Sequence, residues 1–249
     1  MPKLSFLLAF RLAYLCGMYP ALASATSEES TASSLYLADL APTQLKEQTD
    51  PASPAPTMRP APQEALQRLL AGNARFVDDT LEHPNRTAER REAFLSHQEP
   101  FAVIVGCADS RVSPEILFDQ GVGDLFVVRV AGNVIGPLEL DSVDYAALYL
   151  HSSVILVLGH ESCGAVDAVL HGKTKDIEHV AKLIAQSIDS VDQEPEADLL
   201  ARSIKANAIR WKDHLLKSPV IQRLVKEGKL AVQAGYYHLQ SGRVELLSP

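Results

Sequence analysis

The chain of 249 residues has few cysteines and no excess of positive charge. It contains only three cysteines, and its formal net charge at pH 7 is −8. Because nucleic acids and anionic membrane surfaces are themselves negatively charged, this balance argues against both as partners. The sequence also has no internal repeat and no glycine-rich phosphate-binding loop, since Gly121 and Gly123 form only a GxG pair that we interpret as a turn. With 47% hydrophobic and 22% charged residues, the chain is predicted to be mostly globular, with one domain and a full core.

The N-terminal segment 1–25 differs in composition from the rest of the chain. It carries basic residues but no acid, and an apolar stretch over 12–22 is followed by the small residues Ala23 and Ala25. This pattern is typical of a secretory signal peptide cleaved after Ala23 or Ala25, and an uncleaved anchor or a buried core helix is the alternative. Arg11 splits an already short apolar span, which disfavours an anchor. We therefore expect a periplasmic or secreted protein with no stable membrane anchor after cleavage.

Residues 26–61 are rich in serine, threonine, alanine and proline and show no sustained apolar period. Such a composition buries too little apolar surface to fold, so we predict a mostly disordered linker, with a short helix around 31–40 as an open alternative. The folded domain is predicted to span 62–249, because Pro62 is a favourable first residue for a helix.

Helical patterns and continuous apolar runs alternate within this domain. Helices are expected at about 64–76, 87–97, 113–118 (with Ser113 as N-cap), 138–151, from 163 onward, and over about 176–227. Strands are expected at 101–106, 125–130 and 153–159 and within 229–239 and 242–247. Continuous rather than alternating apolar strands indicate a sheet covered on both faces. The predicted fold is α/β, with a mainly parallel central sheet of about four parallel strands plus a C-terminal antiparallel strand, and helices on both faces.

Three potential metal ligands follow the ends of predicted strands. Cys107 and His160 each stand just past a buried strand, and Cys163 opens a helix whose dipole favours a thiolate. Because sites in parallel sheets lie at the carboxyl ends of strands, these residues can converge, and a Cys₂His set with one open position is a known catalytic zinc site. The alternative is a Cys107–Cys163 disulfide in an oxidising compartment, which leaves His160 unexplained.

Asp109 and Arg111 accompany the first cysteine. A zinc ion held by two thiolates and one imidazole has a formal charge of zero, so it is a weaker Lewis acid than one held by three histidines. Asp109 can accept a hydrogen bond from zinc-bound hydroxide and orient it, while Arg111 holds Asp109 ionised through a bidentate pair. Asp109 could instead bind the zinc and close the site, or the pair could be a surface ion pair that contributes little.

Two paired motifs, CADSR at 107–111 and HESCG at 160–164, resemble those of the β-class carbonic anhydrases. The resemblance extends through FVVRVAGN at 126–133 and AGYYHLQSGRVELL at 234–247, and it covers roughly 62–249. It implies a mostly parallel sheet with helices on both sides. It also implies a homodimer or a dimer of dimers, with active sites at the dimer interface.

The resemblance further assigns roles to individual residues. It implies Zn²⁺ ligands at Cys107, His160 and Cys163 and a catalytic dyad at Asp109 and Arg111. Substrate-binding positions are implied at Gln98, Phe126, Tyr145 and Gly164. Taken singly, the two aromatic residues fit plain core positions better and Gln98 fits a surface position better. Val130 and Ala131 depart from the residues common in the family, which leaves the pocket shape open. Ile104 replaces a tryptophan of an inhibited subset, so we expect no non-catalytic bicarbonate pocket and an open zinc with Asp109 off the metal.

The activity implied by this resemblance is the reversible hydration of carbon dioxide to bicarbonate and a proton, by attack of zinc-bound hydroxide. No side chain of the sequence is selected as the proton shuttle. A hydrolase of carbonyl sulfide or carbon disulfide on the same scaffold is one alternative. A non-enzymatic secreted protein with a Cys107–Cys163 disulfide is the other.

Overall fold

The computed structural model describes residues 59–189, 191 and 198–248. The expected signal peptide at 1–25 lies outside the described residues, as does the expected linker up to residue 58. The first helix begins at Pro62, the position expected from the sequence.

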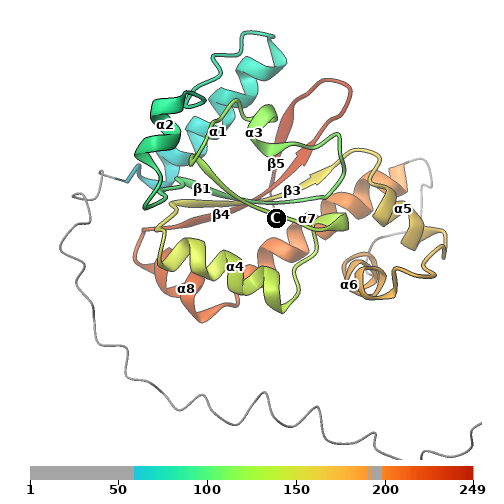
Figure 1. Ribbon diagram of the computed structural model, residues 1–249. Coiled ribbons are helices and arrows are strands. Elements are labelled where there is room, and N and C mark those ends of the chain that lie inside the picture. The colour runs from blue at the N-terminus through green and yellow to red at the C-terminus, as the bar shows by residue number, and fades with distance from the viewer. Residues whose placement is uncertain (1–58, 190, 192–197, 249) are drawn as a thin grey trace, which may run out of the picture. The chain divides into compact units, whose positions relative to one another are not determined.

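Five strands form one sheet in the order β2-β1-β3-β4-β5 (Figure 1). These are β1 (Ala102–Gly106), β2 (Leu125–Arg129), β3 (Val154–His160), β4 (Ala231–Tyr237) and β5 (Val244–Leu247). Strand β1 pairs in parallel with β2 and β3, β3 pairs in parallel with β4, and β5 runs antiparallel to β4. The predicted mainly parallel sheet with a C-terminal antiparallel strand is therefore confirmed.

Several helices of the described residues begin where the sequence supplies a start signal. They are α1 (Pro62–Val77), α2 (Ala88–Ala93), α3 (Pro114–Leu117), α4 (Pro137–Leu148), α5 (Gly164–Leu170), α6 (Glu178–Ile188), α7 (Leu199–Leu215) and α8 (Pro219–Lys226), with a short 3₁₀ helix η1 at Ala131–Asn133. Four of the α-helices open on proline, whose fixed φ suits the first helical position and whose missing N–H is not needed there.

Helices cover both faces of the sheet, as predicted. Successive side chains of a strand point to opposite faces, so Val103 and Val105 of β1 enter one buried cluster and Ile104 enters the other. Leu69 of α1 packs with Ile104, whereas Ala208 of α7 packs on the opposite face. In Figure 1, α1 and α3 lie above the sheet and α4, α7 and α8 lie below it.

The structure corrects the expected helix at 87–97. Helix α2 starts at the Thr87 cap, whose hydroxyl accepts the N–H of Arg90, but it ends at Ala93. Beyond that point the Phe94 ring contacts the guanidinium of Arg90 at 3.7 Å and stacks on His97 at 4.9 Å. The residues after Ala93, which the sequence predicted to be helical, are therefore not part of α2, and Phe94 makes ring contacts there instead.

Two further helix predictions are confirmed in position, and the structure adds detail to each. Ser113 occupies the N-cap position of α3, but its hydroxyl accepts no capping hydrogen bond, because the N–H of Ile116 donates to the Ser113 carbonyl instead. The tract expected to be helical over 176–227 divides into α6, α7 and α8. Helix α8 starts afresh at Ser218, whose hydroxyl accepts the N–H of Ile221 at 3.5 Å.

Across the part of the chain that the structure describes, none of the helices combines the length and apolarity needed to span a bilayer.

Candidate metal centre

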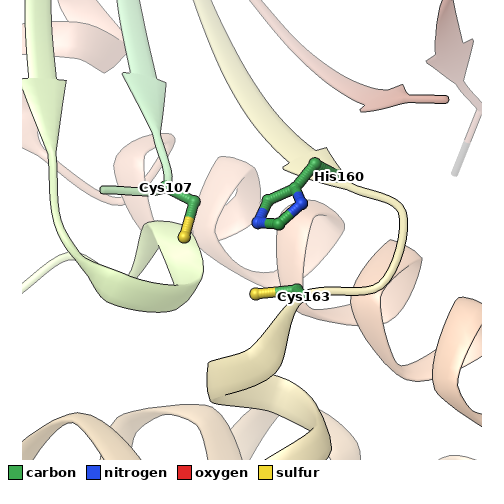
Figure 2. A group of neighbouring side chains, drawn as sticks. All are labelled: Cys107, His160 and Cys163. Atoms are coloured by element: carbon green, nitrogen blue, oxygen red, sulfur yellow. The ribbon is translucent and has the colours of Figure 1, made fainter. Parts of the chain in front are cut away.

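The parallel register of β1 and β3 brings the two sequence motifs to one edge of the sheet. Gly106, the last residue of β1, lies opposite Leu158 of β3, so Cys107 leaves its strand beside the end of the neighbouring strand. His160 is the last residue of β3, and a tight turn then places Cys163 at the N-cap of α5. Figure 2 shows the three side chains pointing toward a common centre.

The three ligand atoms form a compact, buried group. The sulfurs of Cys107 and Cys163 and a ring nitrogen of His160 all lie within 4.8 Å of one another, and all three residues are buried. This spread is comparable with the roughly 4 Å between two ligands that each lie about 2.0–2.3 Å from one zinc ion. Both cysteines are free thiols, so the structure does not form the disulfide considered as an alternative.

The histidine is prepared to bind a metal through one nitrogen. Its Nδ1 lies 2.9 Å from the carbonyl oxygen of Glu161, and because a carbonyl can only accept, Nδ1 carries the proton. Its Nε2 is buried and has no hydrogen-bond partner among the described residues. A buried lone pair without a partner is costly, and a metal ion at the centre of the group would satisfy it. The donor set therefore fits zinc.

The two thiols behave as a coupled pair. The neighbouring Cys163 thiol lowers the pKa of Cys107 to about 4, and the hydrogen bond from the Gly132 N–H adds to this shift, while burial opposes it. The Cys107 thiolate and burial raise the pKa of Cys163. Without a cation the two sulfurs thus share one proton, and a divalent ion binds both as thiolates only by displacing it.

Asp109 stands beside the metal group and is held by Arg111. The guanidinium donates from Nε to Oδ1 at 2.9 Å and from Nη2 to Oδ2 at 2.7 Å, a bidentate pair. These hydrogen bonds keep the pKa of Asp109 well below its usual range, although partial burial opposes the shift. Asp109 Oδ2 is 3.8 Å from His160 Nε2, so a carboxylate permanently ionised at neutral pH faces the metal group.

Arg129, to which the sequence analysis assigned no role, anchors the loop that carries Cys107 and Asp109. Its Nε donates to the carbonyl oxygen of Cys107 at 3.0 Å, and its Nη2 donates to that of Asp109 at 2.6 Å. The arginine lies within the FVVRVAGN stretch at 126–133. Its partners are backbone carbonyls, which every residue type carries, so the sequence does not indicate this contact. One side chain of β2 therefore fixes both the ligand and the carboxylate.

Glu161 anchors the second loop to the last strands. Its backbone N–H donates to the Tyr237 carbonyl at 2.8 Å, which continues the pairing of β3 with β4. Its carboxylate accepts the N–H of Leu239 at 2.8 Å. The C-terminal motif thereby holds the turn between His160 and Cys163.

Comparison with known proteins decides the family. The family model described as carbonic anhydrase matches residues 102–244. A carbonic anhydrase of Mycolicibacterium smegmatis is 41% identical over 201 residues, covering 75% of this chain and 94% of that protein. Carbonic anhydrase 2 of Mycobacterium tuberculosis is 38% identical over 206 residues, covering 74% and 92%. The structure of a Coccomyxa β-carbonic anhydrase in complex with acetazolamide has a TM-score of 0.58 and 27% identity, covering 77% of this chain and 87% of that one.

The chain belongs to the β-class carbonic anhydrases. Its described fold agrees with this assignment.

Within one chain, the expected substrate-binding residues do not all lie beside the metal group. Gly164 directly follows Cys163, and the space beside its Cα is open. Gln98 is exposed and precedes β1, at the opposite end of the strand from Cys107. Phe126 lies opposite Val103, four residues before Cys107.

The remaining expected pocket residue belongs to an aromatic cluster, which we define as Phe126, Tyr145 and Tyr149. The rings of Phe126 and Tyr145 are 6.4 Å apart, and those of Tyr145 and Tyr149 are 5.5 Å apart. Tyr145 is 46% exposed and Tyr149 is 66% exposed. Phe126 is only half-buried on β2, which is an edge strand of the sheet. The cluster therefore has no complete cover within the described part of one chain.

Proposed function

We propose that this protein catalyses the zinc-dependent, reversible hydration of carbon dioxide to bicarbonate and a proton. The observation that carries the proposal is the buried convergence of Cys107, His160 and Cys163, with the unpartnered Nε2 of His160 facing their centre, in a chain of the carbonic anhydrase family. Two thiolates and one imidazole would hold zinc and leave a fourth position open, and zinc in such a site lowers the pKa of water toward about 7.

Asp109 orients the reacting water. Because Arg111 keeps its carboxylate ionised, Asp109 acts only as a hydrogen-bond acceptor at neutral pH. A fixed acceptor beside the metal group determines where the proton of the water points, and therefore where its lone pair points. Asp109 is already engaged by Arg111, so in our proposal it stays off the metal and does not close the site.

The catalytic unit is proposed to be a homodimer or a dimer of dimers. Gln98, Phe126 and Tyr145 are candidate substrate contacts, yet in one chain Gln98 precedes β1 at the end opposite Cys107, and Phe126, which packs with Tyr145, pairs with Val103 rather than with the end of β1. A second copy seated on the edge strand and the exposed aromatic cluster would cover that apolar surface. It would also bring these residues to the partner's metal group.

We further propose that the protein acts outside the cytoplasm. The support is the composition of residues 1–25, which matches a cleavable secretory signal. The mass of the protein purified from culture medium or periplasm tests this: loss of 23 or 25 residues supports export, and a full-length chain confined to the cytosol contradicts it.

The test of the proposed reaction is a stopped-flow comparison of carbon dioxide hydration with carbonyl sulfide hydrolysis by the zinc-loaded protein. We expect rapid hydration of carbon dioxide that disappears in Cys163→Ser together with the zinc. Negligible hydration alongside fast turnover of carbonyl sulfide would overturn the proposal in favour of a hydrolase on the same scaffold.

A further inference from the structure

A chain of buried hydrogen bonds leads from helix α7 to the first metal-binding sulfur. The indole Nε1–H of Trp211 donates to Asn207 Oδ1 at 3.0 Å. Asn207 Nδ2 donates to the carbonyl oxygen of Gly132 at 2.7 Å, and the Gly132 N–H donates to Cys107 Sγ at 3.2 Å. All four residues are buried, so water does not compete for these bonds. We name this set the α7–sulfur chain.

Each bond in this chain fixes the direction of the next one. Because the Trp211 N–H can only donate, the oxygen of the Asn207 amide must face it, and the amide nitrogen must then face Gly132. Asn207 lies 75 residues from Gly132 in sequence, so the contact joins the helix to the loop after β2. The side-chain amide thus sets the orientation of a backbone peptide that touches the metal group.

Gly132 can serve in this position because it is a glycine. Its φ is +69°, in the left-handed region, where a side chain would be strained. A Cβ built at this residue would lie 2.7 Å from Cδ1 of Ile184. The close approach of α6 and the positive φ together turn the Gly132 N–H toward Cys107.

We propose that Asn207, held by Trp211, is a positioning residue that tunes the metal centre through the Gly132 N–H. A hydrogen bond to a ligating thiolate withdraws electron density from the sulfur, and the sulfur then donates less charge to the ion. A centre with two thiolates has a formal charge of zero, so this withdrawal raises the Lewis acidity that the site otherwise lacks. The inference rests on the proposed function in that the group is taken to hold zinc.

The test uses metal readouts that do not depend on turnover. Asn207→Leu removes both hydrogen bonds with a side chain of similar size. Trp211→Phe removes the indole N–H together with part of a buried ring, and it leaves the Asn207–Gly132 bond its partners. Ile221→Ala, a buried change on α8 outside the α7–sulfur chain, serves as the control for lost stability. For each variant we would measure the rate of zinc release to a competing chelator and the sulfur-to-cobalt charge-transfer band of the Co²⁺-loaded protein.

We expect zinc release from Asn207→Leu to be faster by about 10-fold or more, because the loop that contacts the Cys107 sulfur loses its anchor to α7 and no longer holds that ligand in place, and this outweighs the stronger charge donation of the freed thiolate. The charge-transfer band should move to lower energy, because a thiolate without its hydrogen bond is easier to oxidise. Trp211→Phe should change both readouts in the same direction by less. Ile221→Ala should leave the band in place even where its Tm falls.

An unmoved band in both Asn207→Leu and Trp211→Phe would overturn the inference, as would an equal shift in Ile221→Ala. If Asn207→Leu fails to fold, Trp211→Phe still decides the matter. Failure of this inference can be distinguished from failure of the proposed function. A wild-type protein that binds metal but does not hydrate carbon dioxide contradicts the function alone. A wild-type protein that hydrates carbon dioxide while the variant bands stay unmoved contradicts only the tuning role.

Discussion

At the scale of single residues, the residues that would bind the metal are different from the residues that would orient the reacting water. Cys107, His160 and Cys163 supply the ligand atoms, whereas Asp109 lies beside them and is committed to Arg111. A bidentate arginine both orients a carboxylate and keeps it ionised, so neither partner is expected to work alone. This division predicts different outcomes for changes at ligands and changes at the dyad.

Asp109→Asn is expected to retain one zinc per chain and to lose about 100-fold or more in hydration rate, a typical loss for a positioned proton-handling group. Arg111→Ala should resemble it, because the freed carboxylate loses its orientation. Stopped-flow hydration with parallel metal analysis measures both effects. If the double variant lost the sum of the two single losses in free energy, the residues would not be acting as a unit.

Arg129→Ala is expected to weaken zinc binding by about 10-fold or more, since the carbonyls of Cys107 and Asp109 both lose their donor. Arg129→Lys should recover only part of the loss, because a single ammonium lacks the planar fork that reaches two carbonyls. Competition with a chelator measures the affinities. Equal affinity in the wild type and the alanine variant would remove Arg129 from the support of the site.

At the scale of elements, the loop η1 ties the sheet to α6 and α7 through one glycine. Gly132→Ala should cost about 1–2 kcal/mol for the left-handed backbone alone, and more for the 2.7 Å approach to Ile184. Gly172→Ala provides a matched control, because Gly172 has a φ of +66° and nothing within 4 Å of a Cβ. Thermal unfolding should therefore show a larger loss at Gly132 than at Gly172.

Adding Ile184→Val to Gly132→Ala removes the methyl group that the new Cβ meets. We expect this double variant to recover part of the extra loss, although Ile184→Val alone destabilises the core by about 0.5–1.5 kcal/mol. Equal Tm losses for Gly132→Ala and Gly172→Ala would show that the packing against α6 does not matter.

The same elements show which parts of the fold and site could be predicted from sequence. The buried strands were visible as continuous apolar runs, and Cys107 and His160 as polar residues directly after them. The supports at Arg129 and Asn207 were not visible, because they join residues distant in sequence through backbone carbonyls, which every residue type carries. Helix α2 also ends earlier than its sequence pattern predicted, and the ring of Phe94, the residue after its end, contacts Arg90 and His97.

At the scale of the whole molecule, the proposed shared site needs a second copy of the chain. Tyr149→Glu places a charge on the exposed aromatic cluster, which we expect to lie in the interface, and should shift the protein toward monomers in sedimentation velocity. Hydration should fall while the zinc content stays at one per chain. Ile116→Glu, at a 52% exposed residue of α3, is the control and should remain assembled. A fully active monomer would contradict the proposed shared site.

Zinc K-edge X-ray absorption of the purified wild-type protein tests the central claim most directly. We expect the zinc to have two sulfur neighbours at about 2.3 Å and lighter nitrogen or oxygen neighbours at about 2.0–2.1 Å. A protein that carries no zinc, or a zinc shell that lacks sulfur, would contradict it.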